Sequence, residues 1–365
     1  MKKRVLFVAP FPPPVHGAAL RNQSVADSRI INEAFEMRIF HANQASDVHD
    51  IGKFSWKKVI RTFTDVFKLI NDLISFKPHL VYFNISLFGF ALYRDAIYAF
   101  IFKVFRKKLL YHLRTQGVRE QTEKNSFKKS LFSYLFHNVE VICLSQALFQ
   151  DIAPVYKAVP YIINNGIAIE KISIKAPVIN ASPQILFLSN FSIKKGINEL
   201  FLALQLLKHE KLNFHAIIVG KPFDYTEEEL RAKAKLLEID AMVDIKGPLY
   251  GEKKLEIFSS SDIFVLPTYF EAFPGVVLEA MQFGLPVVST KEGAIPEIVD
   301  DKITGILTET QNVKNLAEAL ATLIKDEKLR AAMGEKGKKK FFENYTLEAF
   351  EKNMVQVFSK VLDDE

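Results

Sequence analysis

The chain has 365 residues, more than one typical domain, and its 49% apolar and 25% charged residues are ordinary for a folded globular protein. Its single cysteine, Cys143, excludes an internal disulfide and fits a reducing compartment. No segment offers the roughly 18 uncharged apolar residues that a membrane-spanning helix needs, so we expect a cytoplasmic protein.

The charge is distributed unevenly along the chain. Residues 1–170 carry 23 Lys and Arg against 13 Asp and Glu, a net charge of +10, whereas the remainder carries 25 against 29, a net of −4. A basic half indicates an anionic partner. No helix-turn-helix, zinc-finger or RNA-recognition signature is present, which disfavours nucleic acid. We therefore expect an anionic membrane surface as the partner, with the protein peripheral on the inner face of the membrane.

Short apolar runs alternate with longer amphipathic segments in the first half. This pattern predicts strands at residues 4–9, 35–41, 79–84, 109–113 and 140–145, and helices at 20–30, 53–77 and 91–105. The loop at 12–19 ends in small residues, and Gly17 there would let a ligand approach the backbone. A plain strand-to-helix turn explains the same residues.

Residues 53–77 interleave cations with Phe, Trp and Ile at approximately helical spacing. Such a helix can lie on a membrane surface. It can equally pack its apolar face on the core of the protein. Residues 103–108 and 124–136 repeat the mixture of basic and aromatic residues.

A segment at 174–183, bracketed by Pro177 and Pro183, has no clear period and predicts a linker. The strand-and-helix alternation then resumes. Strands are predicted at 184–188, 214–219, 242–246, 263–267 and 285–290, and helices at 198–208, 227–237, 253–259, 276–283, 316–324, 329–342 and 347–362. Two such alternating halves favour two doubly wound α/β domains.

The chemistry concentrates between the strands at 263–267 and 285–290, in the run Tyr-Phe-Glu-Ala-Phe-Pro-Gly-Val-Val-Leu-Glu-Ala-Met at 269–281. The helix start at Gly275 and Val276 leaves backbone N–H groups that suit an anion such as a diphosphate. Glu271 and Glu279 bracket this start, and carboxylates there suit sugar or ribose hydroxyls. Two surface glutamates on an amphipathic helix are the alternative interpretation.

This run, with seven residues between its two glutamates, Phe273-Pro274 after the first and Glu-Ala-Met at its end, resembles the signature of the family 4 retaining glycosyltransferases, the group 1 glycosyltransferases. The resemblance implies the GT-B architecture, two Rossmann-like domains facing a cleft. Residues 1–175 would form the acceptor-binding domain, to which a C-terminal helix at 347–365 crosses back. Residues 183–346 would bind the nucleotide-sugar donor.

The resemblance also assigns roles to residues outside the motif. Lys195 matches the lysine that holds the donor diphosphate, whereas Asn190 occupies the usual arginine position of that clamp. Gly17 matches one glycine of the family's first-domain glycine pair. The family places a histidine near the reactive sugar at the end of the strand at 109–113. Here Arg114 falls at that point and His112 lies two residues before it, where it can also be an ordinary core histidine.

In this interpretation Glu271, His112 and Arg114 are catalytic. The donor-binding residues are Lys195, Asn190, Glu279, Phe273, Pro274, Gly275, Val276 and Gly17. The implied activity is retaining transfer of a sugar from a UDP- or GDP-sugar to a glycan or lipid-linked acceptor in cell-surface polysaccharide or glycoconjugate synthesis. No cofactor and no metal are expected, because no Asp-x-Asp motif ends a strand. The alternatives are a sugar-nucleotide epimerase of the same architecture and a non-catalytic homologue that binds nucleotide-sugars.

Overall fold

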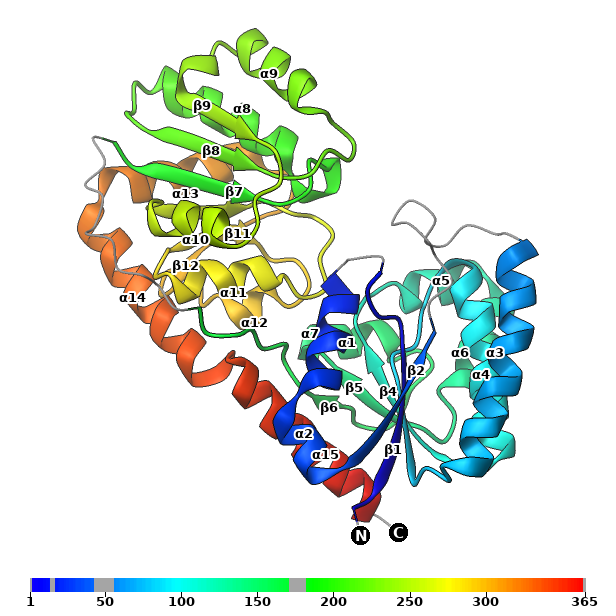
Figure 1. Cartoon of the computed structure of the whole chain (residues 1–365). Coiled ribbons are helices and arrows are strands. Elements are labelled where there is room, and N and C mark those ends of the chain that lie inside the picture. Colours follow the sequence, from blue (N-terminus) through cyan, green and yellow to red (C-terminus); the bar gives the residue numbers. More distant parts are fainter. Residues whose placement is uncertain (1, 14–16, 43–55, 171–181, 364–365) are drawn as a thin grey trace. The chain divides into compact units, whose positions relative to one another are not determined.

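The computed structural model describes residues 2–13, 17–42, 56–170 and 182–363, and the chain forms two compact units (Figure 1). Unit 1 comprises residues 1–165 and 348–365, and unit 2 comprises residues 166–347. Unit 1 ends before the predicted 175, because Ile167 bridges to Thr346 and so belongs with unit 2. Most of the predicted linker at 174–183 lies outside the described residues.

The sheet of unit 1 contains, in the described residues, parallel strands in the order β2-β1-β3-β4-β5-β6. The strands are β1 (Arg4–Ala9), β2 (Glu36–His41), β3 (Leu80–Phe83), β4 (Lys108–Leu113), β5 (Glu140–Cys143) and β6 (Tyr161–Ile162). The central strands are continuous apolar runs with both faces covered, as expected for a parallel sheet. The strand order reverses between β1 and β3, which makes this the topological switch point of unit 1.

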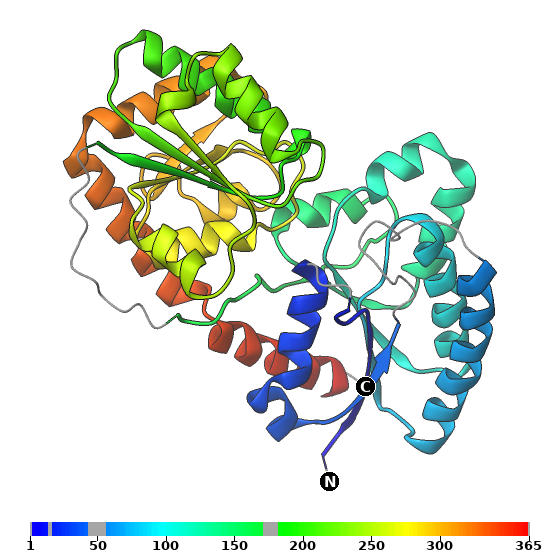
Figure 2. The same cartoon turned by 45° about the horizontal axis from the view of Figure 1, so that its top comes forward.

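Helices cover both faces of this sheet (Figures 1 and 2). They are α1 (Gly17–Asp27), α2 (Arg29–Ala34), α3 (Trp56–Ser75), α4 (Gly89–Val104), α5 (Val118–Lys124), α6 (Ser126–Leu135), α7 (Gln146–Ile152) and α15 (Leu347–Asp363). The single helix expected at 20–30 is wrong. Ser28 adopts an extended conformation and its side chain accepts from Ile31 N, so it ends one helix and caps the next. On α15, Phe358 contacts the rings of Phe35 and Tyr82.

Unit 2 repeats the arrangement, with described parallel strands in the order β12-β11-β10-β7-β8-β9. The strands are β7 (Gln184–Leu188), β8 (His215–Val219), β9 (Val243–Lys246), β10 (Ile263–Leu266), β11 (Val287–Thr290) and β12 (Gly305–Thr308). Their central members are again fully buried. The switch point of this sheet falls between β7 and β10, the strands that precede the two loops of interest.

The helices of unit 2 connect these strands in the right order for a doubly wound sheet. They are α8 (Ile197–His209), α9 (Glu227–Leu236), α10 (Glu252–Ser259), α11 (Gly275–Gln282), α12 (Ile295–Ile298), α13 (Val313–Lys325) and α14 (Glu327–Asn344), with short 3-10 turns η2 (Ile193–Lys195) and η3 (Asp240–Met242). The predicted fold class, two doubly wound α/β domains, is confirmed. The predicted cleft between them stays a prediction.

Candidate functional site

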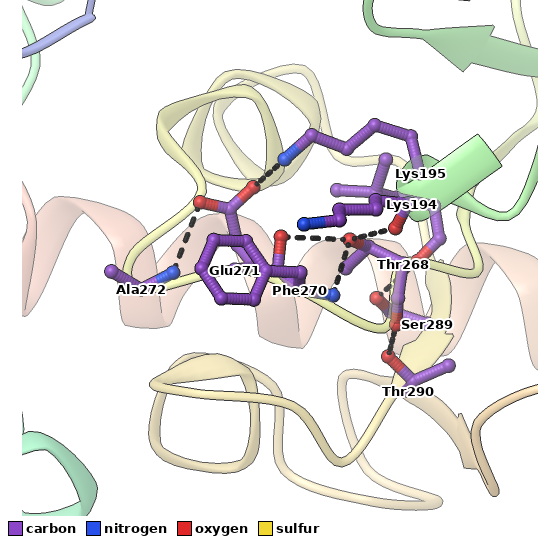
Figure 3. Close-up of polar contacts among 9 residues, drawn as sticks. Lys194, Lys195, Thr268, Phe270, Glu271, Ala272, Ser289 and Thr290 are labelled. Atoms are coloured by element: carbon purple, nitrogen blue, oxygen red, sulfur yellow. Dashed lines mark hydrogen bonds and ion pairs between the residues drawn. The ribbon is translucent and has the colours of Figure 1, made fainter. Parts of the chain in front are cut away.

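The strongest cluster of candidate residues lies at the switch point of unit 2. Lys195 belongs to the loop that follows β7, and Glu271 belongs to the loop that follows β10. Their side chains form an ion pair, with 2.5 Å between Lys195 Nζ and Glu271 Oε2, and they are 24% and 19% exposed (Figure 3). Ligands of open α/β sheets bind outside the carboxyl ends of strands at such a point. The fold therefore brings together two residues that the sequence predicted for one site.

The two loops are locked together through their backbones. Gly196 has a φ of +72°, and a β-carbon there would lie 2.0 Å from the carbonyl oxygen of Pro267. Thr268 Oγ1 and Tyr269 N both donate to Lys194 O, each at 3.0 Å. The Lys194 ammonium in turn lies 4.8 Å from the centre of the Phe270 ring, within cation–π range. Glycine at 196 is thus required for the close approach that sets Lys195 beside Glu271.

The Glu271 carboxylate is held from two sides. Lys195 binds one oxygen, and Ala272 N donates to the other at 3.2 Å (Figure 3). Behind it, Gly293 has a φ of +53° and passes so close that a β-carbon would lie 1.9 Å from Glu271 O. Ala294 N donates to Ala272 O at 3.0 Å and fixes the same loop. The carboxylate is therefore positioned before any ligand arrives.

The helix that follows this loop presents its start to the same region. α11 begins at Gly275, one residue earlier than predicted, and Pro274 is its N-cap without a side-chain cap. The N–H groups of Gly275 and Val276 lie in the first turn, where a helix offers them no internal acceptor. Phe273 is only 7% exposed and its ring lies 6.4 Å from that of Tyr345, so its side chain anchors the loop in the unit.

Glu279, on the second turn of α11, has a cationic partner that the sequence did not reveal. Lys254 of α10 lies 3.0 Å from Glu279 Oε1, and the two side chains are 26% and 22% exposed. The motif does not predict this role for Lys254, because in the sequence Lys254 is one of several lysines on an amphipathic helix. Unit 2 therefore carries two partly buried Lys–Glu pairs, one on each glutamate of the motif.

Asn190 occupies the exposed side of the loop after β7. Its backbone carbonyl accepts from Ser192 N at 2.7 Å, and Asp224 accepts from Ser192 Oγ and Ile193 N, both at 2.8 Å. These bonds give the loop its shape but add no positive charge. Residue 190 therefore adds no cation to this site, whereas Lys195 and Lys254 each pair with a glutamate of the motif.

In unit 1 the structure separates the two candidates of the fourth strand. His112 lies inside β4 and is fully buried, and Tyr82 Oη lies 2.6 Å from its Nδ1. Burial, and secondly the charge of Arg114, lowers the pKa of His112 well below 6.5, so the ring is neutral. If Tyr82 donates to Nδ1, the proton sits on Nε2, which no described residue hydrogen-bonds.

Arg114 follows the end of β4 and joins three elements. Its Nε donates to Asn22 Oδ1 at 3.1 Å and its Nη1 donates to Asn165 Oδ1 at 2.8 Å. Asn22 Nδ2 donates to Pro10 O at 2.8 Å and to Asn84 Oδ1 at 3.1 Å, at the switch point of unit 1. Arg114 Nη2 is buried, and within the described residues it has no hydrogen-bond partner. Sequence reasoning missed the three asparagines, because asparagine carries no motif of its own here.

The remaining candidate, Gly17, is the first residue of α1. A β-carbon there would meet no atom within 4 Å, so packing against the described residues does not require glycine. Among the residues that the structure describes, no group of three or more His, Cys, Asp and Glu side chains could hold a metal ion.

The buried histidine predicts a pH dependence of stability. In the unfolded chain His112 takes up a proton near pH 6.5, whereas in the fold its lowered pKa keeps it neutral. Its contribution is therefore complete above pH 6.5 and is lost as the pH falls, by at most about 1.4 kcal/mol per pH unit. When the free energy of unfolding is measured with urea at pH 7.5 and at pH 5.5, His112→Gln should reduce the loss of stability at the lower pH. The same change at the exposed His137 should leave it unaltered, and equal slopes for all three proteins would contradict the assignment.

Comparisons with known proteins agree with this geometry. Residues 169–340 match the family model "Glycosyl transferases group 1". A D-inositol 3-phosphate glycosyltransferase of Corynebacterium jeikeium is 37% identical over 108 residues, 30% of this chain and 26% of that protein. CapM of Staphylococcus aureus, a capsular polysaccharide biosynthesis glycosyltransferase, is 24% identical over 338 residues and 84% of both chains. The matches to the first curated relatives span only 26% to 35% of those proteins' length.

Solved structures extend the likeness to the whole chain. Sucrose-phosphate synthase of Thermosynechococcus elongatus superposes with a TM-score of 0.78 at 16% identity, over 100% of both chains. HepE of Anabaena, solved in complex with UDP, superposes with a TM-score of 0.76 at 20% identity, over 98% of this chain and 100% of that one. At these identities the likeness shows the fold, and it confirms the predicted GT-B architecture.

Proposed function

We propose that this chain, whose residues 169–340 match the family model "Glycosyl transferases group 1", moves a sugar from a UDP- or GDP-sugar to a glycan or lipid-linked acceptor. We propose further that transfer retains the anomeric configuration, needs no metal, and serves cell-surface polysaccharide or glycoconjugate synthesis. The observation that carries the proposal is the Lys195–Glu271 pair at the switch point of unit 2, beside the start of α11. The relatives add support, since CapM acts in capsular polysaccharide biosynthesis and HepE was solved with UDP.

Each group of the donor site has a role that its chemistry suits. Lys195 and the N–H groups of Gly275 and Val276 would hold the diphosphate and stabilise the charge that grows on it as the sugar leaves. A lysine and a helix start supply positive charge there without a metal ion. Glu271 would accept hydrogen bonds from the transferred sugar. Glu279, oriented by Lys254, would accept from the ribose hydroxyls.

Unit 1 would bind the acceptor. His112 Nε2 and Arg114 Nη2 are buried polar atoms that no described residue satisfies, and each such atom is costly unless a hydrogen-bond partner reaches it. Both nitrogens can donate, so hydroxyl or phosphate oxygens of a sugar substrate are partners of the right chemistry. This supports the proposal that Arg114 takes the place of the family's histidine, with His112 buried two residues before it in β4.

A donor panel tests the proposed function against its alternatives. The purified protein is incubated with UDP- and GDP-sugars and a lipid extract, with and without a chelator. We expect release of the nucleoside diphosphate and a glycosylated acceptor, undiminished by the chelator. An isomerised donor without acceptor would identify an epimerase instead. Thermal stabilisation without any product would identify a binding protein, since a ligand at 100 times its Kd adds about 2.7 kcal/mol.

The second Lys–Glu pair yields a prediction for donor affinity. Glu279→Ala should weaken binding of the nucleoside diphosphate by about 1–3 kcal/mol, because a partly buried charged acceptor for the ribose is lost. Binding of inorganic pyrophosphate, which has no ribose, should not change. Lys254→Met should show the same selective loss, and Lys253→Met, at the exposed neighbouring position, should show none. Calorimetric titration measures all of these, and unchanged nucleotide affinity in Glu279→Ala would remove this residue from the site.

A further inference from the structure

Helix α3 turns its apolar stripe outward. The large side chains that recur at helical spacing are strongly exposed: Trp56 by 74%, Ile60 by 65%, Phe63 by 65% and Phe67 by 74%. The buried face of the same helix contains Leu69 and Leu73, but also the polar Thr62 and Asp65. Of the two interpretations that the sequence left open, packing of this stripe on the core is therefore wrong.

The neighbouring helices repeat this arrangement. Tyr93, Ile97, Phe100 and Val104 form an exposed stripe along α4, at 44%, 46%, 57% and 61%. On α6, Phe127 is 65% exposed and Tyr134 is 41% exposed. Because α3 packs beside α4 and α4 beside α6, the three helices form one layer on one side of unit 1, which we call the helical layer (Figures 1 and 2).

Polar contacts between the helices fix them in this orientation. Tyr98 of α4 donates to Asp65 of α3 at 3.3 Å. Lys103, near the end of α4, donates to the carbonyl oxygens of Leu135 and His137 at the end of α6, at 3.3 and 2.8 Å. The polar groups thus pair between helices, so the outward position of the aromatic side chains is built into the fold.

The charge of the helical layer is one-sided. Exposed cations accompany the stripes: Arg61 and Lys68 on α3, Arg106 just after α4, and Lys129 on α6. The three helices contain three acids, and each is buried or paired. Asp65 and Asp95 are buried, and Asp72 lies 3.2 Å from Arg38. Within the described residues of the layer, no acid is left both exposed and unpaired to offset its cations.

We propose that the helical layer docks unit 1 on the surface of an anionic lipid bilayer. Soluble proteins rarely expose this much contiguous apolar surface without a partner. Aromatic side chains enter the boundary between headgroups and acyl chains, while Arg and Lys at their flanks reach anionic headgroups. Uncompensated positive charge favours this occupant over a second copy of the same basic surface. Among the helices that the structure describes, none combines the length and the apolar character of a membrane span.

Docking on a bilayer restricts the expected acceptor to a lipid-linked molecule, and this step rests on the proposed transferase function. The proposal that unit 1 docks on a bilayer does not depend on that function. A protein held at the bilayer by the domain that binds the acceptor meets acceptors anchored in the same surface. A soluble glycan acceptor would gain nothing from that arrangement.

Vesicle binding of the full chain tests the proposal without any donor or acceptor. We expect cosedimentation with vesicles containing anionic phospholipid at low salt, a loss of at least about tenfold in binding at high salt, and little binding to neutral vesicles. The chain has one tryptophan, and Trp56 lies on the stripe, so its emission should shift to the blue on binding. Absence of binding to anionic vesicles at low salt would overturn the proposal.

Matched variants locate the surface. Phe63→Ser/Phe67→Ser and Arg61→Ser/Lys68→Ser should each weaken binding by about tenfold or more. Leu236→Ser/Tyr250→Ser, which removes apolar residues of unit 2 that are 83% and 74% exposed, should change nothing. All these positions are exposed, and equal thermal unfolding will confirm that the variants fold. Equal binding by all variants would place the contact elsewhere, and self-association abolished by Phe63→Ser/Phe67→Ser would assign the layer to a second copy.

The two proposals fail in different ways. Vesicle binding without sugar transfer would remove the transferase function and leave the docking surface. Sugar transfer to a soluble acceptor without vesicle binding would remove the docking surface and leave the transferase function.

Discussion

Replacing Gly293 by alanine is expected to destabilise unit 2 by about 2–5 kcal/mol and to displace Glu271. The residue has a φ of +53°, and a β-carbon would lie 1.9 Å from Glu271 O and 2.9 Å from Ala272 O. The left-handed conformation costs an L-residue about 1–2 kcal/mol, and forcing a methyl group against a backbone adds a further 1–3. The loop that carries the catalytic candidate must then shift.

Gly284 provides the matched control for this variant. Its φ of +74° is also left-handed, but a β-carbon there would make only ordinary contacts, with Lys338 Cδ at 3.8 Å and Gly334 O at 3.9 Å. Gly284→Ala should therefore cost only the strain of the left-handed backbone, about 1–2 kcal/mol. Comparing the free energies of unfolding of the two variants in urea separates the cost of backbone strain from the cost of the steric contact. An equal loss in both would mean that the packing of Gly293 against Glu271 contributes nothing.

Lys195→Ala should cause the largest loss of nucleoside diphosphate affinity among single changes in the donor site, about 1.5–3 kcal/mol. The change removes the ammonium proposed to bind the diphosphate, and it leaves Glu271 without the partner now 2.5 Å away. An unpaired carboxylate beside the phosphates adds repulsion to the lost attraction. Asn190→Ala should cost much less, because Asn190 offers no charge, and Asn190→Arg should tighten binding.

Calorimetric titration with UDP and GDP ranks these variants. A double variant, Lys195→Met/Glu271→Gln, should recover part of the affinity, because removing both charges removes the repulsion. If Asn190→Ala proves the more damaging change, the assignment of the loop after β7 is wrong. If the double variant binds as weakly as Lys195→Ala, the repulsion from Glu271 is negligible.

The loop between β10 and α11 could be predicted because its signals are local. One short stretch of chain contains all of them: a strand of continuous apolar residues, a proline before a glycine, and a glutamate at each end of the motif. The partner of Glu279 could not be predicted in this way. Lys254 reaches it from a different helix, and the lysine is chosen by how α10 packs beside α11 rather than by any spacing in the sequence.

The orientation of α3 shows a second limit. Helical periodicity predicts that one face of the helix is apolar, but it does not predict which face packs against the rest of the unit. Here the buried face is the one with fewer large apolar residues, and it contains Asp65, which accepts a hydrogen bond from the buried Tyr98. In β4 the end of the strand could be predicted, with His112 inside it and Arg114 after it. The role of His112 could not, because its full burial and its contact with Tyr82 depend on a neighbouring strand.

The order of the units along the chain affects how the protein folds during synthesis. Unit 2 is one continuous stretch, residues 166–347, whereas unit 1 needs residues from both ends of the chain. Phe358 of α15 contacts Phe35 and Tyr82, so these core rings lack a neighbour until the last helix has left the ribosome. Unit 2 has all its strands before then and can complete its sheet first. Unit 1, although most of it is translated first, is therefore the unit that we expect to mature last.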